Sequence, residues 1–255
     1  MKAILAIARR EVDAYFATPL GWLALCGFLA ITGFFFAIML TDFSMQSSQS
    51  MYNPYQQDSM NINEYLLPSF FGNWAVILLF IAPAISMRMF SEDLSKHSFE
   101  MLLSAPISST QIVLGKYLGA LGFLAVMFAA TLHYVVILYW LGTPDPGVLS
   151  ASYAATFLLA ATFVAVGMLA SAYTVNQVVA FVATFALLLV LWVLSWTETL
   201  ASSDLGTVLS YTSMLSHLDQ LTKGLLHLKD AVYFLTFIGF FLFATQQRVE
   251  SFRWR

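Results

Sequence analysis

Six long segments of this 255-residue chain contain no Asp, Glu, Lys or Arg, and this constrains the possible folds more than any other feature. They are Leu20–Leu40, Ser69–Met87, Tyr117–Leu141, Tyr153–Tyr173, Val178–Trp196 and Ala231–Thr245. A helix of about 20 apolar residues spans the hydrocarbon core of a bilayer. Only 10% of the residues are charged, against about 25% in soluble domains. We therefore predict an all-α integral membrane protein with six transmembrane helices. The first is expected to be a span and not a cleaved signal peptide. The last is the least secure prediction, because its apolar segment is the shortest.

Basic residues are distributed unequally between the two sides that these six spans define. Nine of the eleven Lys and Arg residues fall on the side that holds both termini, and Lys223 and Lys229 are the other two. Basic residues concentrate in cytoplasmic segments of membrane proteins. We therefore expect a multi-pass protein of the cytoplasmic (inner) membrane with both termini in the cytoplasm.

The segment before the first span, residues 1–18, has apolar residues at helical spacing with Arg9, Arg10 and Glu11 between them. Pro19 ends the pattern. This combination is typical of an amphipathic helix that lies in the membrane interface. We predict an interfacial elbow helix here, although a simple basic anchor for the first span is the alternative.

The polar stretch at residues 88–116, between the second and third spans, predicts two short helices separated by Pro106. Acidic Glu92 and Asp93 suit the start of the first. Ser108 and Gln111 form a capping box that begins the second. Arg88 and Lys116, at the two ends of the stretch, are expected to anchor it at the positive side of the bilayer. The sequence thus predicts an ordered helix–turn–helix in the cytoplasm.

The segment before the last span, residues 197–230, has apolar residues at helical spacing, among them Met214, Leu218 and Leu221. We expect short helices on the outer leaflet, forming either a cap or a simple return of the chain. His217 lies here and is expected to be solvated, as is His227. His133 is expected to be a hydrogen-bonded packing residue within a span. The single cysteine, Cys26, excludes an internal disulfide and is expected to be buried.

Three separate motifs resemble the type-2 ABC-transporter permease family. Ala8-Arg9-Arg10-Glu11 with Tyr15-Phe16 and Pro19 is similar to the family's elbow helix. The run from Glu92 through Ser98-Phe99-Glu100-Met101-Leu102-Leu103 and Pro106 to Gln111–Lys116 looks like its signature loop. The C-terminal stretch from Lys223-Gly224 to Lys229–Phe234 resembles the gliding-motility and copper-enzyme-maturation branch.

The resemblance implies a single permease domain over residues 1–255 that docks a separate cytoplasmic ABC ATPase. It implies an ATPase-coupling site formed by Glu92, Asp93, Ser98, Phe99, Glu100, Leu102 and Leu103 in the cytoplasmic coupling helix, together with Arg9, Arg10 and Glu11 of the elbow helix. It also implies a homodimer, and leaves room for a membrane partner with a periplasmic domain. ATP would be bound by the partner, so no cofactor, metal or nucleic acid is expected on this chain.

Two functions from different classes fit these expectations. The first is an export permease subunit, driven by the ATPase of a partner chain. The second is a mechanical transmitter that passes ATPase motion to periplasmic or membrane partners without moving a solute. A catalytic role is not expected, because the chain lacks a G-x-x-x-x-G-K-[ST] phosphate loop and the H-E-x-x-H and G-x-S-x-G motifs.

Overall fold

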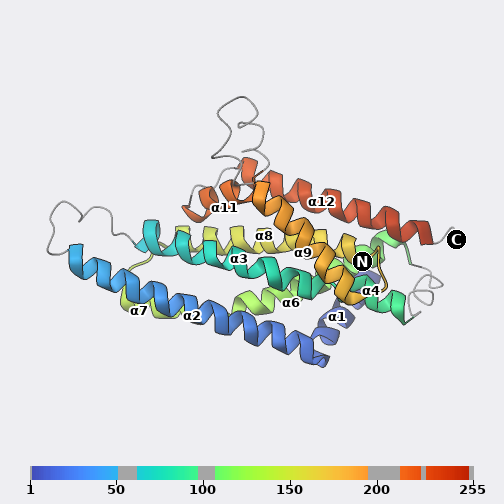
Figure 1. Cartoon of the computed structure of the whole chain (residues 1–255), viewed down its shortest axis with the longest axis horizontal. Coiled ribbons are helices and arrows are strands. Elements are labelled where there is room, and N and C mark those ends of the chain that lie inside the picture. Colours follow the sequence, from blue (N-terminus) through green and yellow to red (C-terminus); the bar gives the residue numbers. More distant parts are fainter. Residues whose placement is uncertain (1, 51–61, 97–106, 195–212, 225–227, 253–255) are drawn as a thin grey trace.

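The computed structural model describes residues 2–50, 62–96, 107–194, 213–224 and 228–252. Within these ranges the regular structure is entirely helical. Figure 1 shows long helices packed along one axis, with the N- and C-termini toward the same end of the molecule as α1 and α4. The all-helical expectation is therefore confirmed for the described part of the chain.

The helices follow the chain without a strand in the described ranges. The order is α1 (Lys2–Ala17), α2 (Pro19–Ser50), a π-helical turn η2 (Ile62–Leu66), α3 (Leu67–Ser86), α4 (Arg88–Ser95), α6 (Ser109–Ala130), α7 (Leu132–Leu141), α8 (Pro146–Ser171), α9 (Gln177–Leu194), α11 (Met214–Thr222) and α12 (Leu228–Ser251).

Within the described residues, five helical segments are long and apolar enough to cross a membrane: Pro19–Ser48, Leu67–Ser95, Ser109–Leu141, Pro146–Ser171 and Leu228–Ser251. The fifth predicted span is represented by a shorter apolar helix, Gln177–Val193. The predicted last span was expected to be the least secure, yet α12 has 24 residues. Flanking polar residues at both ends continue the helix, which apolar length alone could not show.

Helix α8 forms the centre of the bundle. Most of its residues are buried, and α3, α6, α9, α11 and α12 all pack against it. Beside it, the Trp74 indole lies among aromatic rings, with centroid separations of 5.1 Å to Phe71, 5.4 Å to Phe128 and 5.5 Å to Tyr153. These rings come from α3, α6 and α8, so they fix the relative positions of three candidate spans.

The predicted third span is divided into two helices. The capping box is confirmed at its start, where Ser108 Oγ accepts from the Gln111 amide and Gln111 Oε1 accepts from the Ser108 amide. The unpredicted break falls at Thr131, whose hydroxyl donates to the Phe128 carbonyl over 2.6 Å. Such bonding of a Thr hydroxyl back to the preceding turn bends helices.

Two further expectations on single residues are wrong. Cys26 is exposed, because it lies on the outward face of α2. His217 is buried in α11, where its Nδ1 lies 2.5 Å from Asp230 Oδ1 of α12. The expectation of a solvated His217 overlooked this long-range partner. His133 is exposed and its Nδ1 lies 2.7 Å from the Ala130 carbonyl oxygen, while His227 falls outside the described residues.

Candidate functional site

A single buried ammonium group joins three helices at the end of the bundle that holds both termini. Lys116 Nζ of α6 lies 2.7 Å from Glu11 Oε1 of α1 and 2.7 Å from Asp93 Oδ2 of α4. The Lys116 side chain is only 3% exposed, and the Phe90 ring centroid is 5.5 Å from its nitrogen. Enclosure strengthens the attraction between opposite charges and raises the penalty for separating them.

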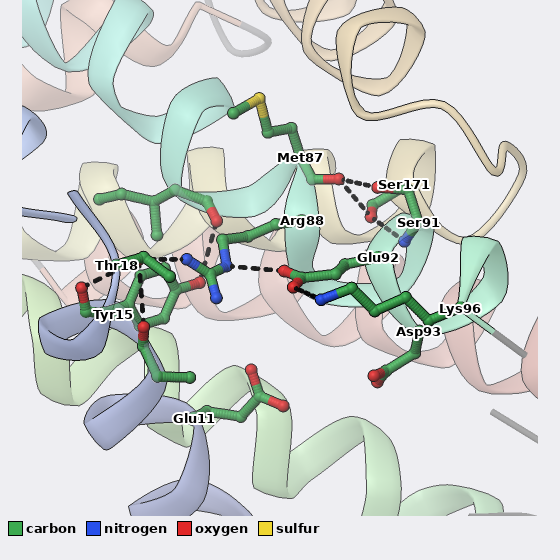
Figure 2. Close-up of polar contacts among 12 residues, drawn as sticks. Glu11, Tyr15, Thr18, Met87, Arg88, Ser91, Glu92, Asp93, Lys96 and Ser171 are labelled. Carbon is green, nitrogen blue, oxygen red and sulfur yellow. Dashed lines mark hydrogen bonds and ion pairs between the residues drawn. The ribbon is translucent and has the colours of Figure 1, made fainter. Parts of the chain in front are cut away.

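The expectation that Lys116 ties the loop to the positive side of the bilayer did not include these two acidic partners. The ammonium is enclosed by protein. One of its partners, Glu11, lies 105 residues earlier in the chain. Figure 2 shows the Glu11 and Asp93 side chains approaching the same region from α1 and α4. A partner so distant in sequence cannot be recognised from a local pattern.

Two glycines of α6 let α1 approach closely enough for this contact. A Cβ atom at Gly115 would lie 2.7 Å from Ile7 Cβ, and one at Gly119 would lie 2.5 Å from Glu11 Cβ and 2.9 Å from the Ala8 carbonyl oxygen. Spacing of small residues by four positions permits such close helix packing. The Gly115–Gly119 pair therefore forms the seat of α1.

Arg88 of α4 makes a second connection, to the corner between α1 and α2. Its Nη1 donates to Thr18 Oγ1 over 2.6 Å, and its Nε lies 3.2 Å from Glu92 Oε2. Lys96 Nζ is 2.7 Å from the other oxygen of Glu92. Figure 2 shows this row of groups, which continues from Thr18 to Lys96. The row ties the corner between α1 and α2 to α4.

Tyr15 supports the same corner from within the core. Its hydroxyl donates to the Ile85 carbonyl oxygen over 2.9 Å, and the Arg88 guanidinium lies 5.2 Å from the centre of its ring. Burial, with a smaller contribution from Glu11, raises the pKa of the Tyr15 hydroxyl. The phenol therefore stays protonated and remains a donor at physiological pH.

The break between α3 and α4 is held by the Ser171 hydroxyl of α8. It accepts from the amides of Phe90 and Ser91, each over 3.0 Å, and donates to the Met87 carbonyl oxygen over 2.9 Å. The Ser91 hydroxyl also donates to the Met87 carbonyl oxygen. One side chain thus attaches the start of α4 to the central helix (Figure 2).

The charged groups surround a small cavity of about 70 Å³. Its lining includes Arg10, Glu11 and Lys116 from α1 and α6, with Arg88, Glu92 and Asp93 from α4. A space of this size can hold water. The charged side chains that line it therefore have space beside them.

The sequence profile of the family described as "ABC-2 family transporter protein" matches residues 5–246, a range that includes Glu11, Asp93 and Lys116. The chain belongs to the ABC-2 transporter family. No curated protein matches it. Members of this family are membrane subunits without nucleotide-binding domains, and they work with an ABC ATPase. This ABC-2 subunit is therefore a multi-pass membrane protein that depends on a partner for ATP hydrolysis.

The structure brings together part of the predicted coupling site of this ABC-2 subunit. Glu92 and Asp93 lie in α4 and Glu11 in α1, all in the charge network, whereas Arg9 and Arg10 are exposed on α1. The remaining predicted residues, Ser98, Phe99, Glu100, Leu102 and Leu103, lie outside the described residues.

Sequence reasoning gave Tyr15, Thr18 and Ser171 no role in the site, and it did not show that Lys116 pairs with Glu11 and Asp93. Tyr and Thr near a predicted interface, and Ser near the end of a predicted span, are too common to be informative by themselves. The one available signal was the pair Gly115 and Gly119 with Lys116 beside it. A face of small residues next to a lysine suits close contact with a helix that carries an acidic side chain. Across the described residues, no group of three His, Cys, Asp or Glu side chains could hold a metal ion.

Proposed function

We propose that the junction of α1, α4 and α6 receives the motion of a cytoplasmic ABC ATPase and passes it to the membrane helices for export. The observation that carries this proposal is the Lys116 ammonium, enclosed between Glu11 and Asp93. Because one buried cation serves both carboxylates, α4 cannot move away from α1 without separating charges. The two helices therefore act on α6 together.

Two contacts support a route from the junction into the bundle. Ser171 attaches the start of α4 to α8, the most buried of the candidate spans. Gly115 and Gly119 attach α1 to α6. A push on the coupling loop or on α1 would thus reach two membrane helices through short, well-packed contacts.

The proposed orientation in the membrane rests on the positive-inside rule. The proposed oligomeric state and the branch of the family rest on the motif resemblance. We infer that the α1–α4 end is cytoplasmic, that the subunit lies in the inner membrane and that it forms a homodimer. The gliding-motility and copper-enzyme-maturation branch is proposed from residues 223–234 alone. Mechanical transmission to a periplasmic-domain partner without solute movement is the alternative that the experiments must separate.

The coupling role is tested with Glu11→Gln in a complex purified with the cognate ATPase. This variant removes one carboxylate from Lys116 while Asp93 still neutralises the ammonium. We expect the ATPase to remain bound but its stimulation by the membrane subunit to fall several-fold. Asp13→Asn is the matched control, because Asp13 is exposed on the same helix. Equal stimulation in the two variants would contradict the proposal.

The predicted contact of Glu100 with the ATPase is tested separately. Glu100→Arg is expected to leave the protein folded in the membrane but to weaken association or coupling, since it reverses a charge in the predicted contact. Glu250→Arg, near the end of α12, is the control for charge reversal outside the predicted contact. Unchanged co-purification and unchanged ATPase stimulation for Glu100→Arg would remove Glu100 from the site.

Export is separated from mechanical transmission in proteoliposomes that contain the complex. ATP-dependent movement of a lipid, glycan, peptide or small hydrophobic compound supports export. Failure with every candidate compound, together with ATPase stimulation that depends on a periplasmic-domain partner, would favour the transmitter.

A further inference from the structure

A cavity of about 570 Å³ lies between α2, η2 and α7, remote from the Lys116 junction. Figure 1 shows the C-terminal part of α2 and helix α7 at the end of the bundle away from α1 and α4. Ligand pockets in proteins commonly enclose about 300–1,000 Å³. The cavity therefore has the size of a small-molecule site.

The cavity lies where three candidate spans reach the boundary of the hydrocarbon core. Its lining includes Leu40, at which the first predicted span ends, and Leu141, at which the third predicted span ends. Leu66 also lines it, directly before α3 begins at Leu67. The neighbouring Trp140 side chain is 88% exposed, and tryptophan is enriched at the interface between lipid and water. A ligand held here would have access to both the lipid chains and the headgroup region.

The lining combines an apolar wall with a row of hydroxyl groups. The apolar side chains come from all three elements: Leu40, Phe43, Ile62, Leu66, Leu138 and Leu141. The hydroxyl groups come from α2, and those of Thr41, Ser44 and Ser48 donate to carbonyl oxygens of their own helix over 2.8, 2.8 and 2.7 Å. A hydroxyl oxygen that donates in this way can still accept hydrogen bonds. The cavity thus offers acceptors beside an apolar surface.

The charges of the surrounding sequence disfavour an anionic ligand. Residues 19–87, which include α2 and η2, contain no Lys or Arg, and neither does α7. Asp42 is exposed on α2, next to Thr41 of the lining. A phosphate, sulfate or carboxylate would lose hydration here without gaining a cation from these segments. An uncharged head with O–H donors would find acceptors.

Two hydrogen bonds of η2 fix the shape of the cavity. Gln46 Nε2 of α2 donates to the Tyr65 hydroxyl over 2.9 Å. The Asp145 amide, directly before α8, donates to Asn63 Oδ1 over 2.9 Å. The turn is therefore attached to both of its neighbouring segments. A site whose walls are fixed before binding loses less conformational entropy when a ligand enters.

We propose that this cavity binds one uncharged, hydroxyl-bearing lipid of the bilayer. The chain of the lipid packs against the leucines and Phe43, and its head donates hydrogen bonds to the Ser and Thr oxygens of α2. Depth in the membrane makes the ligand amphipathic, and the lining selects the kind of head. The site is separate from the ATPase-coupling junction, and the inference does not depend on the proposed function.

The test is photolabelling of the full chain, purified with its ATPase and reconstituted in phosphatidylcholine vesicles. The probe is an oleyl alcohol analogue that carries a diazirine in its chain. We expect saturable labelling of peptides that contain residues 40–48 and 138–141. Ordinary contact with bilayer lipid does not saturate. Labelling of these peptides that fails to saturate, or its absence, would overturn the proposal.

Three competitors with the same chain decide which head is recognised. Oleyl alcohol has an O–H donor, oleyl methyl ether is uncharged without a donor, and oleyl sulfate is anionic. We expect the alcohol to compete about fivefold better than the ether, which is the effect of about one net hydrogen bond, and the sulfate to compete least. Equal competition by the alcohol and either of the others would overturn the proposed specificity. This series uses the unsubstituted protein, so it does not depend on the folding of any variant.

Substitutions then locate the site. Ser44→Phe places a ring in the cavity, whereas Met45→Phe adds the same ring at a position that is 58% exposed and outside the lining. We expect saturable labelling to fall several-fold in the first variant and to stay unchanged in the second. Ser44→Ala combined with Ser48→Ala should reduce the preference for the alcohol over the ether. Equal labelling in the two Phe variants would mean that the probe binds elsewhere, and the proposal would be wrong.

Discussion

The enclosed Lys116 ammonium is expected to contribute to the free energy of unfolding through its ion pairs with Glu11 and Asp93. Lys116→Met would leave Glu11 and Asp93 facing each other without a cation. Removing one partner from a buried ion pair costs about 3 kcal/mol or more, and we expect a loss of about 3 kcal/mol here because both carboxylates stay partly exposed. Reversible unfolding in detergent would measure it.

Lys96 provides the control for this substitution. Its side chain is 67% exposed and pairs with Glu92 of the same helix. Exposed pairs contribute less than about 1 kcal/mol. Lys96→Met should therefore change stability little, and equal losses in the two variants would mean that enclosure of Lys116 is unimportant.

The Tyr15 hydroxyl contributes through a single buried hydrogen bond. Tyr15→Phe keeps the ring between Phe123 and Arg88 but leaves the Ile85 carbonyl oxygen without this donor. We expect a loss of about 1–2 kcal/mol, the usual range for a buried group that loses its partner. Thermal unfolding would test it against Tyr139→Phe, because Tyr139 is exposed. A loss no greater than that of the control would show that the bond is not stabilising.

At the scale of elements, the contact between α1 and α6 depends on the absence of side chains. Gly119→Ala would place a methyl group against Glu11 and the Ala8 backbone, so α1 must shift. Overpacking of this kind costs about 1–3 kcal/mol. We expect faster hydrogen exchange in α1, with α8 unchanged.

Gly239→Ala is the matched control, since a Cβ atom at Gly239 in α12 would meet nothing within 4 Å. That substitution should be neutral or stabilising by up to about 1 kcal/mol, because alanine has the higher helix propensity. If exchange in α1 responds equally to both substitutions, the proposed seat of α1 is wrong.

Elements with a local signal were predictable, and elements defined by distant partners were not. The start of α6 follows from Ser108 and Gln111, which are three residues apart and cap the helix by themselves. The break at Thr131 has no such signal, because Thr commonly bonds to the preceding turn without ending a helix. Glu11 and Lys116 were both noted in the sequence, but nothing local shows that they meet. His217 was misplaced for the same reason.

At the scale of the whole molecule, the placement of the two termini leads to a prediction of membrane topology. In a Cys26→Ser background, Lys96→Cys lies at the α1–α4 end and Thr143→Cys precedes α8 at the other end. The positive-inside rule places the first in the cytoplasm. An impermeant maleimide applied to intact cells should label the second variant and spare the first until the membrane is opened. The reverse result would invert the proposed orientation.

The seat of α1 also has a consequence for the order of events during synthesis. Helix α1 emerges from the ribosome before α6, because Gly115, Lys116 and Gly119 follow it by about a hundred residues. At translation rates of about 5–20 residues per second, that delay lasts on the order of 5–20 seconds. Throughout this interval α1 has its basic, amphipathic sequence but lacks its main packing partner, α6, so the membrane surface is its natural resting place. The newborn chain therefore completes the junction of α1, α4 and α6 only after α6 has been synthesised.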